Sequence, residues 1–206
     1  LQKLRKNPVI IKKYYKNQED ERLLIKYENL PLITKRNRYE AIKEAESKFD
    51  MAILDDGFQD TSIKKNLNII CFHENQLIGN GYVFPSGPLR ENINTIKNVS
   101  IAIINGKKNE KFEKQILKIN SSIKFFYTNY VFEELQKFKN KNLLAIAGIG
   151  NPNNFFELLK KNGMKVKKTL PYPDHYEFNR EELLKIINLA QTNNYTIVTT
   201  QKDFLR

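Results

Sequence analysis

Two adjacent carboxylates follow the most informative apolar run of this sequence. Met51–Leu54 is short and apolar, and Asp55, Asp56 and Gly57 come directly after it. This pattern predicts a buried strand that delivers acids to the carboxyl edge of a parallel sheet, where α/β proteins bind their ligands. Acids at such an edge commonly hold Mg²⁺ for phosphoryl transfer. A turn or capping acid after a core strand is the alternative, and the acid pair alone does not decide between the two.

Three other positions carry side chains suited to phosphate or proton chemistry. Arg90 ends a loop rich in Gly and Pro and could clamp a phosphate, although the composition alone favours a plain connecting loop. His175 follows Asp174 in a loop framed by proline and aromatic residues, which favours acid/base work, or the holding of a base, over an ordinary surface histidine. Lys202 follows a predicted strand and is either a phosphate contact or an ordinary surface lysine.

Several common site patterns do not occur in the printed sequence. It contains no Gly-x-x-x-x-Gly-Lys-[Ser/Thr] phosphate loop and no Gly-x-Ser-x-Gly nucleophile turn. One cysteine, Cys71, and two distant histidines leave no zinc spacing and no internal disulfide framework. The Gly-Ile-Gly segment at 148–150 resembles the beginning of a dinucleotide fingerprint, but Asn153 takes the third glycine position. Backbone geometry is therefore favoured over nucleotide binding by roughly three to one.

Charge points to anionic partners. The formal net charge is +12 over 206 residues, which favours nucleic acid, phospholipid or phosphorylated substrates. The lysines are spread along the chain, however, and a solvated surface accounts for most of them. Residues 1–16, with Tyr14 and Tyr15, are the best candidate for a local basic and aromatic patch. The chain begins with Leu1 and ends just after a predicted strand, so we expect a fragment trimmed at both ends.

Hydrophobic periodicity predicts strands that alternate with helices. Strands are expected at 8–12, 30–34, 51–54, 67–72, 99–105, 143–147, 165–170 and 196–200. Helices are expected at 20–27, 38–49, 153–161 and 180–191, the third capped by Asn153. The mixed, charged segment 111–142 is expected to contain a linker. Strands alternating with helices imply a parallel sheet with right-handed crossovers.

Five motifs in order resemble those of the tetraacyldisaccharide 4'-kinase family, the lipid A 4'-kinases. They are Asp-Asp-Gly-Phe-Gln at 55–59, Pro-Ser-Gly-Pro-Leu-Arg-Glu at 85–91, Gly-Ile-Gly-Asn-Pro at 148–152 with Phe155 and Phe156, Pro-Asp-His-Tyr at 173–176, and Thr-Thr-Gln-Lys-Asp at 199–203. Each is weak alone, but five in register across nearly the whole chain are specific.

The resemblance implies an α/β fold with two lobes. Residues 1–125 would be a truncated, P-loop-kinase-like parallel sheet lobe, whose Walker loop would precede Leu1. Residues 126–142 would be a linker, and residues 143–206 a smaller Rossmann-like lobe.

The same resemblance implies a lipid kinase. Family members use ATP and Mg²⁺ to phosphorylate the 4'-hydroxyl of tetraacyldisaccharide 1-phosphate in lipid A biosynthesis. They work at the cytoplasmic face of the bacterial inner membrane, so this protein would be peripheral or anchored through its missing N-terminus. Its partners would be the glycolipid and an anionic membrane surface, and no nucleic acid is expected. Residues 1–206 alone are expected not to turn over ATP.

Site roles follow from the matching motifs. Mg²⁺ would be held by Asp55 and Asp56. The nucleotide would be contacted by Asp56, Gln59 and Lys202. Anionic oxygens of the substrate would be contacted by Arg38 and Arg90. Asp20 would be the general base, and His175, supported by Asp174, would pair with it.

The sequence departs from the family pattern at three positions. Asp20 lies in Gln-Glu-Asp-Glu-Arg at 18–22, where the family has Val-Gly-Asp-Glu-Pro, so Glu19 and Arg22 replace Gly and Pro. Asp60 replaces the family's usual His after the acid pair. Two alternatives remain: a non-catalytic Rossmann-like nucleotide-binding module that uses residues 148–152, and a basic nucleic-acid-binding protein, for which no recognition motif is present.

Overall fold

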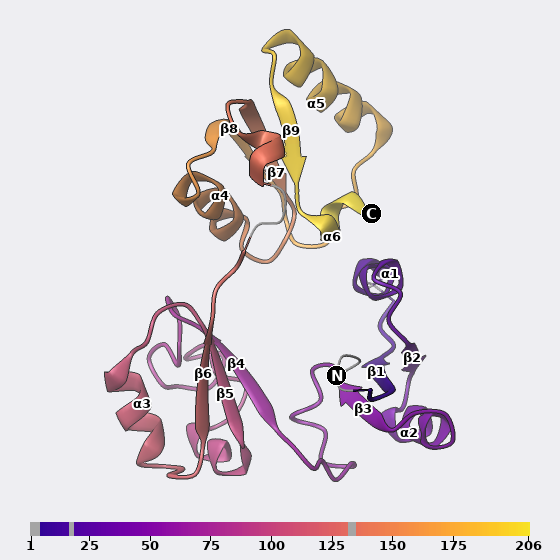
Figure 1. The fold of residues 1–206 in the computed structure, drawn as a ribbon, viewed down its shortest axis with the longest axis vertical. Coiled ribbons are helices and arrows are strands. Elements are labelled where there is room, and N and C mark those ends of the chain that lie inside the picture. Colours follow the sequence, from indigo (N-terminus) through magenta and orange to yellow (C-terminus); the bar gives the residue numbers. More distant parts are fainter. Residues whose placement is uncertain (1–4, 17–18, 132–134) are drawn as a thin grey trace. The chain divides into compact units, whose positions relative to one another are not determined.

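The computed structural model describes residues 5–16, 19–131 and 135–206. Contacts group the chain into two units, unit 1 with residues 1–55 and 133–206 and unit 2 with residues 56–132. Both units consist of parallel strands with helices between them (Figure 1). The predicted α/β class with parallel sheets is therefore confirmed.

The first sheet of unit 1 has the strand order β2-β1-β3. Its elements are β1 (Pro8–Lys13), α1 (Glu19–Tyr27), β2 (Leu32–Lys35), α2 (Arg38–Glu46) and β3 (Met51–Leu54). Side chains alternate between the two faces of a strand. Val9 and Ile11 therefore share one face of β1, where they pack against Ala41 and Ala45 of α2, and all four are buried. The core of this sheet lies between β1 and α2.

Strand β3 forms where the sequence predicts it, but the prediction that it is buried is wrong. Met51 is 39% exposed and Ile53 is 41% exposed. Among the described strands, β3 pairs with β1 alone and stands at the sheet edge. The run has the residue types of a buried strand, but burial depends on neighbouring elements, which a local pattern does not reveal. The delivery of the acids is as predicted: Asp55 directly follows the parallel strand, and its amide donates to the Ile11 carbonyl at 3.0 Å.

The second sheet of unit 1 has the order β8-β7-β9. Its elements are β7 (Asn142–Ala147), α4 (Pro152–Lys161), β8 (Lys165–Pro171), α5 (Arg180–Thr192), β9 (Thr196–Thr199) and α6 (Gln201–Phe204), with a short 3₁₀ helix, η3 (Leu135–Phe138), before them. The central strand β7 is buried almost throughout, as its apolar run predicts. The N-cap of α4 is Asn151 and not the predicted Asn153, because Pro152 takes the first helical turn.

Unit 2 contains the third sheet, with the order β4-β5-β6. Its elements are β4 (Ile69–His73), a 3₁₀ helix η2 (Ile93–Asn98), β5 (Ile101–Asn105), α3 (Glu110–Leu117) and β6 (Lys124–Thr128). Ala102 and Ile104 of β5 share a buried cluster with Phe112 and Ile116 of α3. The sequence analysis assigned neither α3 nor β6. In α3, lysines and glutamates outnumber the apolar residues, whereas the short aromatic run of β6 lies within a mixed, charged segment of the sequence.

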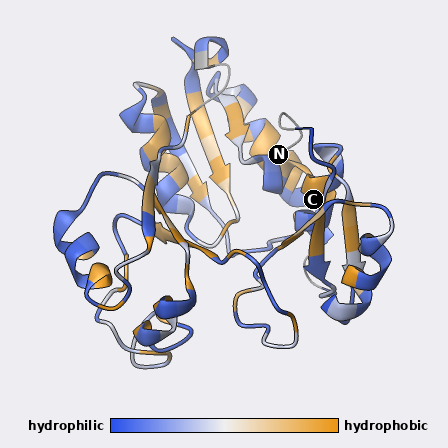
Figure 2. Cartoon of the chain, turned by 60° about the horizontal axis from the view of Figure 1, so that its bottom comes forward, coloured by the Kyte–Doolittle hydropathy of each residue, from blue (hydrophilic) through white to orange (hydrophobic). Residues whose placement is uncertain are grey.

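Hydrophobic residues concentrate on the strands, and hydrophilic residues cover much of the helices (Figure 2). No helix within the described ranges is long and apolar enough to cross a membrane. The boundary between residues 132 and 133 falls inside the predicted linker 126–142, and β6 covers the first three residues of that linker. The predicted domain limits stay a prediction.

Candidate active site

An aspartate of α1 and a histidine 155 residues later lie in contact within unit 1. Asp20 Oδ2 is 3.0 Å from His175 Nδ1. The Asp20 side chain is 4% exposed, whereas that of His175 is 31% exposed. The structure therefore joins two of the predicted catalytic residues and leaves the histidine as the accessible member of the pair.

Two cations also contact the Asp20 carboxylate. Arg206 donates to Oδ2 from Nε at 2.9 Å and from Nη2 at 2.5 Å, and Lys202 Nζ lies 3.6 Å from the same oxygen. Burial alone would raise the pKa of Asp20, but the hydrogen bonds from Arg206 and from the Glu21 amide, with the charge of Lys202, lower it below its ordinary value. Asp20 is therefore ionised at neutral pH. An ionised carboxylate only accepts hydrogen bonds, so Nδ1 of His175 carries the proton.

Asp174, the third residue predicted to be catalytic, belongs to the same cluster. Its Oδ2 lies 3.8 Å from His175 Nε2, and its Oδ1 lies 3.6 Å from Lys202 Nζ. Asp174 Oδ1 also accepts the backbone amide of His175 at 3.0 Å. His175 has a φ of 59°, a left-handed conformation that is uncommon for a residue with a Cβ and often marks functional sites. The geometry groups these side chains, and their catalytic roles stay predictions.

Aromatic packing holds the loop that carries Asp174 and His175. The rings of Tyr172, Tyr176 and Phe178 pack together with centroids between 4.7 and 5.2 Å apart. The Tyr176 hydroxyl donates to Glu182 Oε1 of α5 at 2.5 Å, and this hydrogen bond raises the pKa of Tyr176. The aromatic framing noted in the sequence therefore has a structural purpose, because it fixes the loop against α5.

Asp55, at the carboxyl end of β3, pairs with a buried lysine. Lys12 Nζ lies 2.5 Å from Asp55 Oδ2 and 2.5 Å from Glu21 Oε2. Arg38, which is 8% exposed, donates from Nη2 to the Asp55 backbone carbonyl at 2.8 Å. Arg38 thus anchors the end of β3, and its predicted contact with substrate stays a prediction.

Asp56 and Arg90 form a short ion pair in unit 2. Arg90 Nη1 donates to Asp56 Oδ1 at 2.6 Å, and the two side chains are 67% and 64% exposed. Gln59, the other residue of this motif with a predicted nucleotide contact, is exposed as well. All three side chains are therefore accessible to a ligand.

Asp55 and Asp56 offer carboxylate oxygens, the ligand type that Mg²⁺ prefers. Within the described residues, no three His, Cys, Asp or Glu side chains are grouped closely enough to hold a metal ion. Mg²⁺ commonly takes only one or two protein carboxylates, and waters and substrate phosphates complete its octahedron. The Asp55 and Asp56 side chains are 46% and 64% exposed, so their oxygens are chemically suitable and accessible.

A comparison with known protein families matches residues 2–206 to the tetraacyldisaccharide-1-P 4'-kinase family. The chain belongs to this family. The resemblance inferred from the five motifs is thus confirmed.

Individual family members agree with this assignment. The tetraacyldisaccharide 4'-kinase of Pelagibacter ubique is 42% identical over 200 residues, which cover 95% of this chain and 63% of that protein. The tetraacyldisaccharide 4'-kinase of Haemophilus influenzae is 32% identical over 191 residues, covering 91% of this chain and 55% of that protein. The chain therefore spans about 63% or less of the length of these two relatives.

A solved structure of the family has the same fold. The crystal structure of the "apo" form of LpxK from Aquifex aeolicus in complex with ATP aligns with a TM-score of 0.65 at 23% identity. The alignment covers 98% of this chain and 70% of that one. At this identity the likeness establishes the fold alone.

The Gly-Ile-Gly turn of this family member packs against the His175 loop. The Gly148 amide donates to Asp203 Oδ2 at 3.1 Å. A Cβ at Gly148 would lie 3.1 Å from the Pro173 carbonyl oxygen, and one at Gly150 would lie 3.4 Å from Asp174 Oδ2. Gly148 thus allows a close approach between the turn after β7 and the loop that carries Asp174, whereas a Cβ at Gly150 would make an ordinary contact. The close approach at Gly148 favours the backbone-geometry interpretation of this turn.

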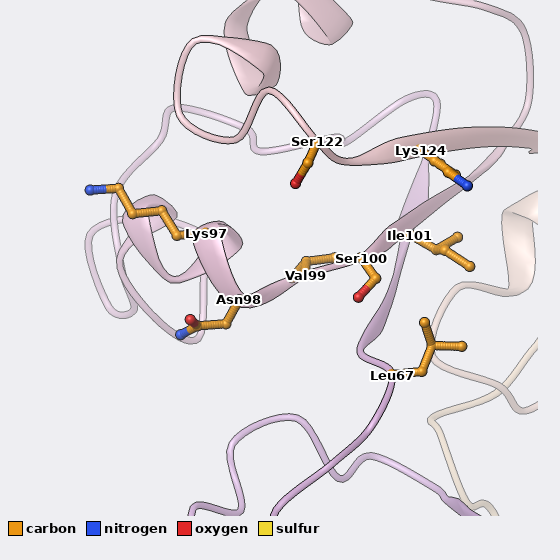
Figure 3. Close-up of a pocket in the computed structure, with 8 residues that line it drawn as sticks. All are labelled: Leu67, Lys97, Asn98, Val99, Ser100, Ile101, Ser122 and Lys124. Carbon is orange, nitrogen blue, oxygen red and sulfur yellow. The ribbon is translucent and has the colours of Figure 1, made fainter.

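A surface pocket of about 390 Å³ lies in unit 2. It is lined by Leu67, Lys97, Asn98, Val99, Ser100, Ile101, Ser122 and Lys124, at the amino ends of the three strands (Figure 3). Its two lysine side chains extend in opposite directions in Figure 3 and do not converge on one point. The predicted site residues of unit 2 do not line this pocket; they are Asp56, Gln59 and Arg90.

Three charged residues of this site were missed by the sequence analysis: Lys12, Glu21 and Arg206. Glu21 was inside the motif that pointed to Asp20, and its position next to Asp20 was the available signal. Lys12 ends a predicted strand, and its sequence context is that of a surface lysine. In the structure, however, only 7% of its side chain is exposed. For Arg206 the sequence offered no motif.

Proposed function

We propose that the full-length protein transfers the γ-phosphoryl group of ATP to the 4'-hydroxyl of tetraacyldisaccharide 1-phosphate. The family, the names of its members and the ATP complex of the Aquifex protein support this proposal. The observation that carries it is the contact of Asp20 with His175, 3.0 Å apart and 155 residues apart in sequence. The activity is assigned to the whole protein because the chain spans only part of its relatives.

In this proposal Asp20 accepts the proton of the attacking hydroxyl, and His175 orients its carboxylate through Nδ1. Phosphoryl transfer depends on positioning and charge more than on covalent chemistry. The lowered pKa of Asp20 keeps it in the ionised form that accepts a proton, but also makes it a weaker base. Lys202 contributes to that lowering from 3.6 Å. If Lys202 shifts toward a phosphate, as its predicted role requires, Asp20 regains basicity.

Asp55 and Asp56 would hold Mg²⁺, which when bound neutralises the charge on phosphate oxygens. Asp56, Gln59 and Lys202 would contact the nucleotide, and Arg38 and Arg90 would contact anionic oxygens of the substrate. The exposure of Arg90 and Gln59 supports access to these ligands. Arg38 acts in the structure through its hydrogen bond to the Asp55 carbonyl, so its influence on a ligand would pass through the end of β3.

The protein is proposed to act at the anionic cytoplasmic surface of the inner membrane. Tyr14, Tyr15 and Tyr27 are 42%, 47% and 60% exposed. The Arg22 guanidinium lies 4.7 Å from the centre of the Tyr14 ring, and Lys13 Nζ lies 5.8 Å from that of Tyr15. Exposed aromatic rings beside basic groups suit a boundary between water and anionic lipid headgroups.

The test is phosphoryl transfer by the purified full-length protein. Labelled phosphate from ATP should appear on tetraacyldisaccharide 1-phosphate, and Asp20→Asn should slow this transfer by about 10²- to 10⁴-fold. Glu44→Gln is the matched control, because Glu44 is an exposed acid in the same unit, paired with Lys35. Nucleotide binding without transfer, or binding that is indifferent to the glycolipid, would instead support a non-catalytic nucleotide-binding module.

A further inference from the structure

Lys12 is a buried lysine at the carboxyl end of β1. Val9 and Ile11 face α2, so the alternation of the strand places Lys12 on the opposite face of the sheet. Only 7% of its side chain is exposed. Lysine is almost never buried to this degree unless its ammonium is paired. Its position therefore depends on the charges around it.

Two carboxylates from different elements meet at this ammonium. Lys12 Nζ lies 2.5 Å from Oε2 of Glu21, which is in the first turn of α1. It also lies 2.5 Å from Oδ2 of Asp55, which follows the end of β3. Without the ammonium, these two acids would repel each other across a partly buried space. Lys12 thus joins the end of one strand to the beginning of a helix.

The charge network continues from Glu21 toward the Asp20 cluster. The second oxygen of Glu21 lies 3.5 Å from Lys202 Nζ, which in turn lies 3.6 Å from Asp20 Oδ2. The Glu21 amide also donates to Asp20 Oδ1 at 2.9 Å. Fixing Glu21 therefore fixes the helical turn that presents Asp20.

We propose that Lys12 is a positioning residue that sets Asp55 relative to the first turn of α1, and through that turn relative to Asp20. The inference rests on the proposed function for its consequence, because Asp55 is the proposed Mg²⁺ ligand and Asp20 the proposed base. Within the described residues, the Lys12 ammonium pairs with Glu21 and Asp55 and not with the Asp20 carboxylate. Its effect is exerted through Glu21 and Asp55.

The same sheet offers a matched control. Lys35, on β2, pairs with Glu44 of α2 at 2.9 Å, but the two side chains are 44% and 40% exposed. This pair also links a strand to a helix, and it includes none of the proposed site residues. Exposed ion pairs of this kind contribute little to protein stability. Lys35→Met therefore removes a lysine from a comparable position without disturbing the site.

The experiment compares full-length wild-type protein with Lys12→Met and Lys35→Met. Two quantities are measured: hydrogen exchange of the Asp55 amide, which donates to Ile11, and steady-state phosphoryl transfer. Lys12→Met should accelerate Asp55 exchange by about tenfold, because the end of β3 opens locally. It should lower kcat by about 10²-fold with KM for the glycolipid within a factor of about three, as expected for misplaced groups. Lys35→Met should leave both quantities unchanged.

A second variant separates charge bridging from loss of packing. Adding Glu21→Gln to Lys12→Met removes the repulsion between the two acids, so Asp55 exchange should slow again toward the wild-type rate. If Lys12→Met does not fold, Lys12→Gln replaces it, because its amide can still donate hydrogen bonds but carries no charge.

The outcomes distinguish this inference from the proposed function. If the wild-type protein does not transfer phosphate, the proposed function fails, and the exchange measurement still decides whether Lys12 positions Asp55. Wild-type exchange at Asp55 together with kcat within twofold of wild type in the Lys12 variant would overturn the inference. Faster exchange that Glu21→Gln does not reverse would contradict it as well.

Discussion

Two ion pairs of this molecule have nearly the same length but opposite surroundings. Arg206 meets Asp20 at 2.5 Å with side chains that are 6% and 4% exposed. Arg90 meets Asp56 at 2.6 Å with side chains that are 67% and 64% exposed. Water screens the second pair, whereas the first pair is surrounded by protein. The distance between two charged groups therefore does not by itself determine how much an ion pair contributes to stability.

The comparison separates two tasks within one proposed reaction. The buried pair joins segments 186 residues apart and sets the protonation of the proposed base. The exposed pair joins Asp56 to the Gly- and Pro-rich loop and leaves both side chains largely in contact with solvent. We expect substitutions in the buried cluster to affect both folding and catalysis, and substitutions in the exposed pair to leave folding nearly unchanged.

The largest effect is expected at the accessible member of the buried cluster. His175→Ala in the full-length protein should lower kcat by about 10²- to 10⁴-fold, because Asp20 loses the partner that orients it. Affinity for the nucleotide should change little, since His175 contacts Asp20 and not a proposed nucleotide ligand. Steady-state kinetics and equilibrium nucleotide binding measure the two quantities. A loss of affinity with kcat unchanged would contradict the proposed pairing.

Arg206 provides the next largest effect, on stability. Arg206→Met should lower the free energy of unfolding by about 3–5 kcal/mol, because it leaves Asp20 and Asp203 as buried acids without their shared cation. Denaturant unfolding measures this change. Lys160→Met is the control, since Lys160 pairs with Glu157 on the surface of α4 and should cost less than about 1 kcal/mol. Equal costs for the two variants would remove the contrast between buried and exposed pairs.

The pH dependence of stability gives a smaller effect with a definite sign. The pKa of Asp20 is lowered in the folded state from its ordinary value of 3.8. Its contribution is therefore fully present above that value and is lost as the pH falls through the lower, folded-state pKa. Wild-type protein should lose up to about 1.4 kcal/mol per pH unit more than Asp20→Asn in this acidic range. If the free energy of unfolding falls with pH equally in both proteins below pH 3.8, the Asp20 pKa is not lowered.

The exposed pair should give the smallest change in stability. Asp56→Asn should alter the free energy of unfolding by no more than about 1 kcal/mol, because both partners are well solvated. Phosphoryl transfer by the same variant should nevertheless fall strongly if Asp56 holds Mg²⁺. Unfolding and activity measured on one preparation test both statements. Destabilisation as large as that of Arg206→Met would show that Asp56 is a structural residue.

Much of the fold was predictable because the strands and helices have regular local patterns. The central strands β5 and β7 and the helices α2, α4 and α5 follow from their apolar periodicity. The exposure of β3 could not be predicted, since it depends on which elements cover a strand. Helix α3 was missed because its buried side, Phe112 and Ile116, amounts to two residues among charged ones.

The site was predictable only in part. The motifs placed Asp20, the adjacent Asp174 and His175, and Lys202 on three separate segments. The resemblance paired Asp20 with His175, which the structure shows in contact. Lys12 and Arg206 could not be found this way, because isolated basic residues in a chain with a net charge of +12 carry no signal of their burial. Their roles depend on three-dimensional neighbours from distant parts of the sequence.

The central claim is that Asp20 and His175 act as one unit in phosphoryl transfer. A double-mutant cycle on the full-length protein tests it most directly, with kcat measured for wild type, Asp20→Asn, His175→Ala and the double variant. The account predicts that the double variant is about as slow as the slower single variant, because either change already disables the pair. If the two losses multiply, the residues act independently and the account is contradicted.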